Sequence, residues 1–178
     1  MARLVVINGV PGSGKTTLSR RLYKELPDVI LLNKDTFKEF LFDTLPPGDF
    51  QWSKLLGRVS LEALYTMVRV FLKNERDVIL ENAFYKEFAM HDIPSFGVPV
   101  LEIYCKCDES VRQERYIDRT NTTRHPGHMD KDGSTLNPET YAPLQVGEVT
   151  YVDTTHGVSD AGISELADTV RHFLKINE

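Results

Sequence analysis

Residues 9–16 read Gly-Val-Pro-Gly-Ser-Gly-Lys-Thr, a complete G-x-x-x-x-G-K-[ST] phosphate-binding loop. Glycines allow backbone angles with positive φ, so several amide N–H groups can converge on one phosphate chain. Lys15 can reach the β- and γ-phosphates, and the Thr16 hydroxyl can ligate Mg²⁺. The pattern predicts a nucleoside triphosphate site, the alternative being a degenerate loop. The predicted nucleotide-binding residues here are Gly9, Pro11, Gly12, Ser13, Gly14, Lys15, Thr16 and Thr17.

The residues on either side of this loop are of the types that it requires. A short apolar run, residues 4–7, precedes it, and an amphipathic segment, residues 15–26, follows it. Three leucines of that segment fall on one face, as in a helix packed on a core. A helix at this place turns its N-terminus, with its partial positive charge, toward the phosphate.

Asp35 follows a second apolar run, residues 29–32, and opens a short amphipathic helix that we expect to begin near Thr36. It can cap that helix, since Asp is a favoured N-cap residue. It can also act as a general base, or as the carboxylate that orients an acceptor hydroxyl opposite the γ-phosphate. Residues 33–35 miss the N-K-x-D guanine-recognition motif by one position, which favours ATP over GTP.

Glu81 ends a third apolar run, residues 77–80. Nucleotide-binding proteins place a carboxylate, usually Asp, at this point to orient Mg²⁺. Glu81 is therefore predicted to ligate the metal together with Thr16, the alternative being a carboxylate that bonds loop backbone. Asn82 and Tyr85 come directly after it and are predicted to touch the acceptor substrate.

Arg58 is a further candidate for the acceptor, because it stands on an otherwise apolar helical segment. It would bind an anionic or hydroxylated substrate, and an ion pair with Glu62 at position i+4 is the competing interpretation. Two aromatic side chains nearby, Phe37 and Trp52, are interpreted as core residues rather than as residues that stack on a ligand.

Arg115 and Arg119 lie one turn apart on a charged helical segment, and Arg124 follows in a turn rich in Thr and Asn. Phosphoryl transfer spreads negative charge over equatorial oxygens, which planar guanidinium groups match well. These arginines therefore indicate a lid that clamps phosphate. The alternative is a solvated helix face, in which Glu114 and Asp118 pair with the arginines.

Two pairs of potential metal ligands are interpreted as structural. Cys105 and Cys107 alternate in a strand-like run with no second Cys/His pair at a suitable spacing, so we expect reduced buried thiols. His125 and His128 enclose a Pro-Gly pair, and no carboxylate or cysteine accompanies them at a known spacing. We expect the histidines to stiffen a turn or to line the substrate site.

Apolar runs of strand type alternate with helical patterns along the chain. The predicted strands are residues 3–8, 29–32, 77–80, 98–107 and 150–152. The predicted helices are residues 15–26, a short piece from 36, 52–73, 109–119 and 162–175. This alternation argues for a parallel sheet covered on both faces, with ligands bound beyond the carboxyl ends of its strands.

Composition limits the kind of protein. The chain has 178 residues with 41% hydrophobic content, which suits one globular domain. It lacks an apolar run long enough to span a membrane and a signal-peptide pattern at its start, so we expect a cytoplasmic protein. The net charge of -5 argues against long nucleic-acid tracks, which need a basic face.

Taken together, these residues resemble the P-loop kinase group of small ATP-dependent phosphotransferases. The resemblance is to the branch (AAA_33-like) that holds chloramphenicol phosphotransferase, zeta-toxin-like kinases and many proteins called "AAA family ATPase" or predicted kinases. The matching pieces are residues 5–18, 33–35, 78–84, the arginine segment with 124–128, and 152–154.

The resemblance implies an α/β fold, the P-loop NTPase three-layer sandwich, with a five-stranded parallel sheet of order 2-3-1-4-5. Residues 1–178 would form a single kinase domain. Its acceptor-binding cap would span about residues 36–74, and a short lid, about residues 119–133, would carry Arg119 and Arg124.

The same resemblance assigns several site residues. Asp35 falls where this branch has its acceptor-activating carboxylate, and the adenine would lie near Arg115, Asp153 and Thr154. The sequence departs from the pattern at Glu81, where a Walker B strand usually has Asp. It also lacks the arginine-finger and sensor modules of AAA machines, so no motor is implied.

The expected activity is ATP- and Mg²⁺-dependent transfer of the γ-phosphate to a hydroxyl of a small molecule. Lys15, Asp35, Arg119 and Arg124 are the predicted catalytic residues, and the expected assembly is a monomer or a dimer. One alternative keeps the chemistry and takes a 5′-hydroxyl polynucleotide end as acceptor. The other is a nucleotide-binding regulatory NTPase that has no acceptor.

Overall fold

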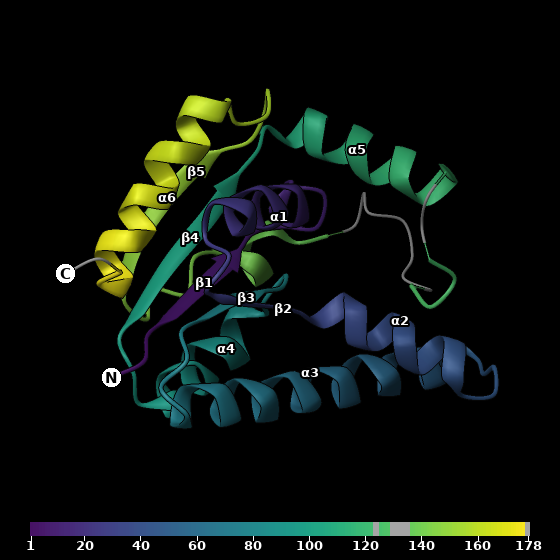
Figure 1. The fold of residues 1–178 in the computed structure, drawn as a ribbon. Coiled ribbons are helices and arrows are strands. Elements are labelled where there is room, and N and C mark those ends of the chain that lie inside the picture. Colours follow the sequence, from purple (N-terminus) through teal and green to yellow (C-terminus); the bar gives the residue numbers. More distant parts are fainter. Residues whose placement is uncertain (123–124, 129–135, 177–178) are drawn as a thin grey trace.

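The computed structural model describes residues 1–122, 125–128 and 136–176, and Figure 1 shows their arrangement. Five strands form one parallel sheet in the order β2-β3-β1-β4-β5. Their bounds are β1 (Leu4–Asn8), β2 (Ile30–Asn33), β3 (Val78–Glu81), β4 (Val100–Lys106) and β5 (Glu148–Asp153). The predicted α/β class and strand order are confirmed.

Helices cover both faces of this sheet, which makes three layers (Figure 1). The helices are α1 (Lys15–Glu25), α2 (Lys34–Thr44), α3 (Phe50–Lys73), α4 (Lys86–Asp92), α5 (Glu109–Thr122) and α6 (Asp160–Leu174). Two short 3-10 turns, η1 (Pro94–Phe96) and η3 (Pro138–Tyr141), complete the described elements. None of the helices within the described ranges has both the length and the apolar character needed to cross a membrane.

The alternation of side chains along β1 divides the core into two clusters. Val5 and Ile7 face α1 and α6, where they pack with leucines such as Leu22 and Leu166. Leu4 and Val6 point to the other face and pack in the cluster that includes α3. All five residues of β1 are buried, as expected of a central parallel strand covered on both sides.

The start of α2 differs from the prediction, which had Asp35 as a possible N-cap. The cap is Asn33, whose side-chain oxygen accepts a hydrogen bond of 3.1 Å from the Thr36 amide. Asn and Asp are equally favoured caps, so the choice depends on where the strand ends. Asp35 instead lies in the first turn of α2. Its side chain is thus not engaged as a cap.

Other boundaries shift for local reasons. The fourth strand begins at Val100 rather than at 98, because Pro99 has no amide to donate to a ladder. The charged helix α5 continues to Thr122, beyond its predicted end at 119. Helix α4 was not predicted, since its seven residues give little periodic signal.

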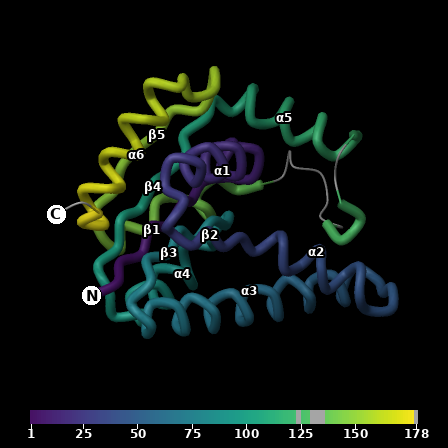
Figure 2. Tube along the Cα trace, viewed as in Figure 1, coloured from purple at the N-terminus to yellow at the C-terminus, as the bar shows by residue number. Residues whose placement is uncertain are grey.

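Helices α2 and α3 contact each other along one side of the sheet, and the trace in Figure 2 shows them as neighbours. Their residues are those for which an acceptor cap was predicted, about 36–74. The described turn of residues 125–128 lies against this pair and follows α5 in the chain. Part of the predicted lid, including Arg124, lies outside the described residues.

Candidate active site

Three glycines shape the phosphate loop between β1 and α1. Gly9, Gly12 and Gly14 have φ values of +148°, +90° and +82°. A Cβ added at Gly12 would stand 2.7 Å from the Arg112 carbonyl oxygen, and one at Gly9 would stand 2.8 Å from the Cys105 carbonyl oxygen. The loop backbone therefore lies directly against α5 and β4, and only glycine fits at these two positions.

Two long-range contacts fix the back of the loop. The Thr154 hydroxyl, just after β5, donates to the Ser13 carbonyl over 2.7 Å. The Arg112 guanidinium donates to the Pro11 carbonyl over 3.0 Å and pairs with Glu109 at 2.5 Å. Arg112 is only 2% exposed, unlike most residues of a charged helix. The contact of Arg112 with the loop could not be predicted, because in the sequence this residue lies in a run of alternating charges.

The ammonium group of Lys15 lies at the mouth of the loop, where Nζ donates to the Val10 carbonyl over 3.0 Å. The residue is buried. Burial lowers the pKa of Lys15 below its ordinary value, although the charge of Glu81 acts in the opposite direction. A buried cation that lacks full compensation is suited to bind an anion such as a phosphate.

Thr16 and Glu81 meet at the carboxyl ends of β1 and β3. The Thr16 hydroxyl lies 3.4 Å and 3.3 Å from the two carboxylate oxygens of Glu81, and Asn33 also donates to that carboxylate. Glu81 therefore bonds side chains here rather than loop backbone. Burial raises its pKa, against the opposing influence of Lys15. Hydroxyl and carboxylate oxygens are the ligands that Mg²⁺ prefers, so this pair fits the predicted metal.

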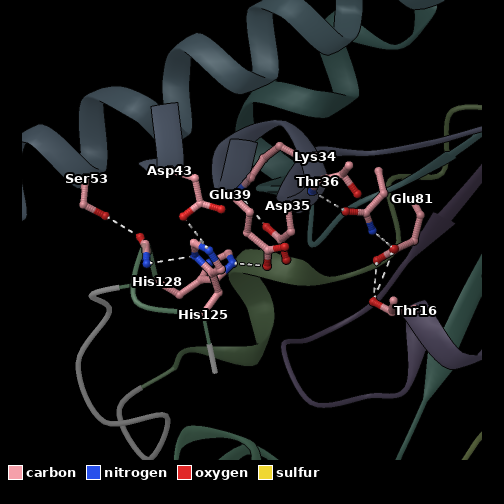
Figure 3. Close-up of polar contacts among 12 residues, drawn as sticks. Thr16, Lys34, Asp35, Thr36, Glu39, Asp43, Ser53, Glu81, His125 and His128 are labelled. Atoms are coloured by element: carbon pink, nitrogen blue, oxygen red, sulfur yellow. Dashed lines mark hydrogen bonds and ion pairs between the residues drawn. The ribbon is translucent and has the colours of Figure 1, made fainter. Parts of the chain in front are cut away.

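Asp35 lies beside this group on the first turn of α2 (Figure 3). Its carboxylate is 3.7 Å from Lys34 Nζ, and its side chain is 46% exposed. Burial by itself would raise the pKa of Asp35, but the surrounding charges of Lys34, His128, Lys15 and Arg119 lower it overall. Asp35 is therefore held as a carboxylate at neutral pH, within the electrostatic reach of the phosphate-loop lysine.

A small cavity of about 200 Å³ adjoins the other side of the loop. Thr17, Leu18, Arg115 and Thr154 are among its lining residues. Arg115 is held there because its guanidinium donates to the Thr154 carbonyl over 3.0 Å. The structure thus brings together two of the residues predicted to lie near the adenine.

Asp153, the third residue predicted near the adenine, does not line that cavity. Its carboxylate accepts a 2.8 Å hydrogen bond from the Thr155 amide, and this bond lowers its pKa. It lines a larger cavity of about 390 Å³ behind the loop, together with Ser13 and Arg112. The Ser13 hydroxyl is buried and has no hydrogen-bond partner among the described residues.

The predicted arginine clamp is described only in part. The Arg119 guanidinium lies 5.6 Å from the ring centroid of Tyr116 on the same helix. Its charge helps to lower the pKa values of Lys15 and Asp35, which indicates that it faces the site. Within the described ranges, neither Arg115 nor Arg119 pairs with the acidic residues of α5 that the alternative interpretation required.

The predicted acceptor residues divide into two groups. Asn82 is buried, and Tyr85 is 52% exposed with its ring 5.3 Å from that of Tyr141. Asn82 directly follows β3, and Tyr85 comes three residues later. Arg58 is exposed on α3, and within the described part of the chain no ion pair joins it to Glu62 or to the site. The structure therefore does not bring Arg58 to the other candidates.

The aromatic residues of the cap pack as expected. Phe37 lies against the core cluster that contains α3. Trp52 contacts Phe42, with ring centroids 5.4 Å apart. Phe37 thus agrees with its interpretation as a core residue, whereas the half-buried Trp52 packs on α2 and belongs to neither core cluster of the described residues.

The cysteines and histidines form no metal centre among the residues that the structure describes. Both cysteines are free thiols. Cys105 is buried, which raises its pKa to about 12, whereas Cys107 is half-buried. His125 and His128 instead contact two carboxylates of α2, at Asp43 and Glu39. The prediction of reduced thiols therefore holds for both cysteines, and that of burial for Cys105 alone.

A buried polar network at the base of the loop was missed in the sequence. Asn8 accepts hydrogen bonds from the amides of Gly9 and Phe84, at 2.8 Å and 3.2 Å, and donates to Glu102 over 3.1 Å. Glu102 is fully buried and also accepts from the Leu144 amide over 2.9 Å. The signal available in the sequence was Glu102 itself, a charged residue inside an otherwise apolar strand. The network connects the loop to the segments after β3 and η3.

Comparison with known proteins agrees with this geometry. A family model described as an AAA domain (AAA_33) matches residues 4–134, more than half of the chain. The protein therefore belongs to this family. No curated protein matches the sequence.

Solved structures share the whole fold. The chain is 29% identical to a candidate kinase from Chloroflexus aurantiacus, with a TM-score of 0.86 over 96% of this chain and 97% of that one. A sugar kinase from Janibacter sp. gives 17% identity and a TM-score of 0.65, over 99% and 96% of the two chains. The APS kinase of Mycobacterium tuberculosis, solved with AMPPNP and APS, gives 15% and 0.61, over 98% of each chain. The last two show the fold alone, which is that of the P-loop kinases.

Proposed function

We propose that the protein is an ATP-dependent phosphotransferase that moves the γ-phosphate to a hydroxyl of a small molecule. The observation that carries the proposal is the placement of the Asp35 carboxylate beside the phosphate loop, where the charges of Lys34, His128 and Lys15 lower its pKa. A protein that only binds or hydrolyses a nucleotide has no need of this second carboxylate. A kinase needs one to orient its acceptor.

Each residue of the site would have a defined part. Lys15 and the loop amides would bind the β- and γ-phosphates, and Arg115 and Thr154 would line the adenine side. Thr16 and Glu81 would hold Mg²⁺, which supplies charge neutralisation when bound. Gly9 and Gly12, which leave no room for a Cβ, and the Thr16–Glu81 oxygen pair fit these ligands.

The acceptor would lie on the α2 side of the loop. Asp35 would accept a hydrogen bond from the acceptor hydroxyl and orient its oxygen toward the γ-phosphate. Its lowered pKa makes it an effective orienting group and a weak base. Asn82 and Tyr85 would contact the same substrate, and Arg119 with Arg124 would neutralise the transferring group.

The arrangement of parts follows the same proposal. Residues 1–178 would be one kinase domain, with an acceptor cap over about residues 36–74 and a lid over about residues 119–133. Support comes from the APS kinase, which has the same fold and was solved with the nucleotide analogue AMPPNP. The proposal also includes a requirement for Mg²⁺, a monomeric or dimeric assembly, and a cytoplasmic location.

The test is ATP consumption with Mg²⁺ across a panel of acceptors: hydroxylated metabolites, nucleosides, aminoglycoside- and phenicol-type antibiotics, and 5′-hydroxyl oligonucleotides. Wild type is compared with Lys15→Ala and Asp35→Asn. We expect turnover that one acceptor class stimulates and that both variants lose. Slow turnover that no acceptor changes, and that Asp35→Asn retains, would overturn the kinase and leave a nucleotide-dependent regulator.

A further inference from the structure

Helix α2 presents three carboxylates at a spacing of four residues: Asp35, Glu39 and Asp43. Side chains at this spacing share one face of a helix, and like charges there repel one another. Two imidazoles from the turn at residues 125–128 lie against this face (Figure 3). His128 Nε2 is 3.0 Å from Glu39, and His125 Nε2 is 3.2 Å from Asp43.

The same turn is also fixed to α3. The buried Ser53 hydroxyl donates to the Gly127 carbonyl over 2.8 Å. A Cβ added at Gly127 would stand 3.0 Å from the ring of Phe42, so the backbone lies directly on α2 at this point. The turn therefore contacts both helices of the cap, through backbone on one side and through imidazoles on the other.

The hydrogen bonds distinguish the two histidines. The Gly127 amide donates to His125 Nδ1 over 3.1 Å, so this nitrogen carries no proton and Nε2 donates to Asp43. His125 is thus a neutral ring in this arrangement. His128 has no such constraint among the described contacts, and its ring contacts the Glu39 carboxylate. The charge of His128 is among those that lower the pKa of Asp35.

We propose that the turn His125-Pro126-Gly127-His128 is a clasp that holds α2 against α3, and that His128 is the positioning residue for Asp35. The bond to Glu39 holds the imidazole beside the first turns of α2. The charge of His128 then acts on the Asp35 carboxylate and compensates the acidic face. The catalytic consequence rests on the proposed kinase function, but the clasp does not.

The first experiment uses no nucleotide and no acceptor. Amide hydrogen exchange of α2 is measured on the full-length protein for wild type, His128→Gln and a matched control, His172→Gln, on the exposed surface of α6. We expect exchange within residues 34–44 to rise about tenfold in His128→Gln, the loss of one charged hydrogen bond, and to stay unchanged in the control. Equal exchange in all three proteins would overturn the clasp.

The second experiment reads the charge on Asp35 directly. A ¹³C NMR titration of its carboxyl gives the pKa in wild type, His128→Gln and His128→Lys. We expect a higher pKa in the Gln variant and a value near that of wild type in the Lys variant, which keeps the positive charge. A pKa that is the same in the Gln variant as in wild type would overturn the positioning role, even if the clasp survives.

Kinetics with an acceptor from the panel then connect the clasp to turnover. His128→Gln should lower kcat/KM for the acceptor and leave the KM for ATP unchanged. His128→Lys, which keeps a positive charge at this position, should retain the wild-type kcat/KM for the acceptor. If no acceptor stimulates turnover, the proposed function fails while the exchange and titration results still decide the clasp.

Discussion

The Thr16 hydroxyl lies 3.3 Å and 3.4 Å from the two oxygens of the Glu81 carboxylate, although 65 residues separate them in the chain. Parallel pairing of β1 and β3 produces this contact, since Ile7 and Glu81 share a register position. The pair unites one residue of the phosphate loop with one from the neighbouring strand.

Glu81→Gln should stabilise the protein without nucleotide and weaken Mg²⁺-dependent nucleotide binding. Burial raises the pKa of Glu81, so ionising it costs folding free energy. Wild-type stability should therefore fall as the pH rises from the ordinary value of about 4.3 through the raised folded value. The variant should lose this part of the pH dependence and gain about 1 kcal/mol at neutral pH.

Thermal unfolding between pH 4 and 8 measures the effect of Glu81→Gln. The matched control is Glu165→Gln, an exposed carboxylate on α6. If the stability of wild type and of Glu81→Gln changed with pH in the same way over this range, ionising Glu81 would not cost folding free energy.

Lys15→Met should abolish nucleotide binding and leave the free protein at least as stable as wild type. Burial lowers the pKa of Lys15, so its protonated form costs stability at every pH below that value. Methionine removes the charge and keeps most of the volume. A nonhydrolysable ATP analogue at 100 times its Kd should stabilise wild type by about 2.7 kcal/mol and the variant by nothing measurable.

Thermal shift with and without the analogue tests the Lys15 prediction, with Lys24→Met on the exposed last turn of α1 as the control. The control should keep the full ligand shift. Destabilisation of Lys15→Met in the absence of ligand would mean that the ammonium group stabilises the fold.

Asp35→Asn should reduce acceptor-stimulated turnover by about 10²- to 10⁴-fold and leave nucleotide binding intact. The lowered pKa of Asp35 implies that it remains ionised down to below about pH 3.9, so wild type should show no acidic limb from this group between pH 5 and 7. Its contribution to stability should likewise be present above that pH and be lost below it.

Steady-state rates over pH 5–8 decide the Asp35 prediction, with Asp28→Asn, an exposed residue before β2, as the control. A variant that keeps wild-type acceptor turnover would remove Asp35 from the reaction.

Arg112→Ala should weaken nucleotide binding and destabilise the fold by about 1–3 kcal/mol, because the Pro11 carbonyl and the half-exposed Glu109 lose their donor. Glu109→Gln keeps the guanidinium on the loop and should cost less. Chemical denaturation together with nucleotide titration separates the two variants. If Glu109→Gln cost as much as Arg112→Ala, the contact with the loop would contribute little.

Gly12→Ala should disrupt the phosphate loop, because the new Cβ would stand 2.7 Å from the Arg112 carbonyl oxygen at a φ of +90°. Gly97→Ala is the matched control, with a φ of +69° and no atom within 4 Å. Both variants carry backbone strain of about 1–2 kcal/mol, but only Gly12→Ala should also lose nucleotide binding. Equal binding by both proteins would contradict the close packing of loop and helix.

The sequence by itself determined the features that depend on a few neighbouring residues. The phosphate loop is fixed by its glycines and by Lys15, and the strands and longer helices by the period of their apolar residues. The residues after each strand could also be predicted as site residues, because parallel strands end at one edge of the sheet. Thr16, Asp35 and Glu81 were found in this way.

Only the tertiary structure decided which distant groups meet. Arg112 contacts Pro11, which is 101 residues away, and His128 contacts Glu39, which is 89 residues away. In the sequence, Arg112 looked like part of a solvated charge run, and His128 looked like part of an isolated turn. Such pairs depend on how separate elements pack, and packing is set by the volume and shape of the whole core. The local sequence pattern does not encode this packing, so neither the contact of Arg112 with Pro11 nor the clasp could be predicted.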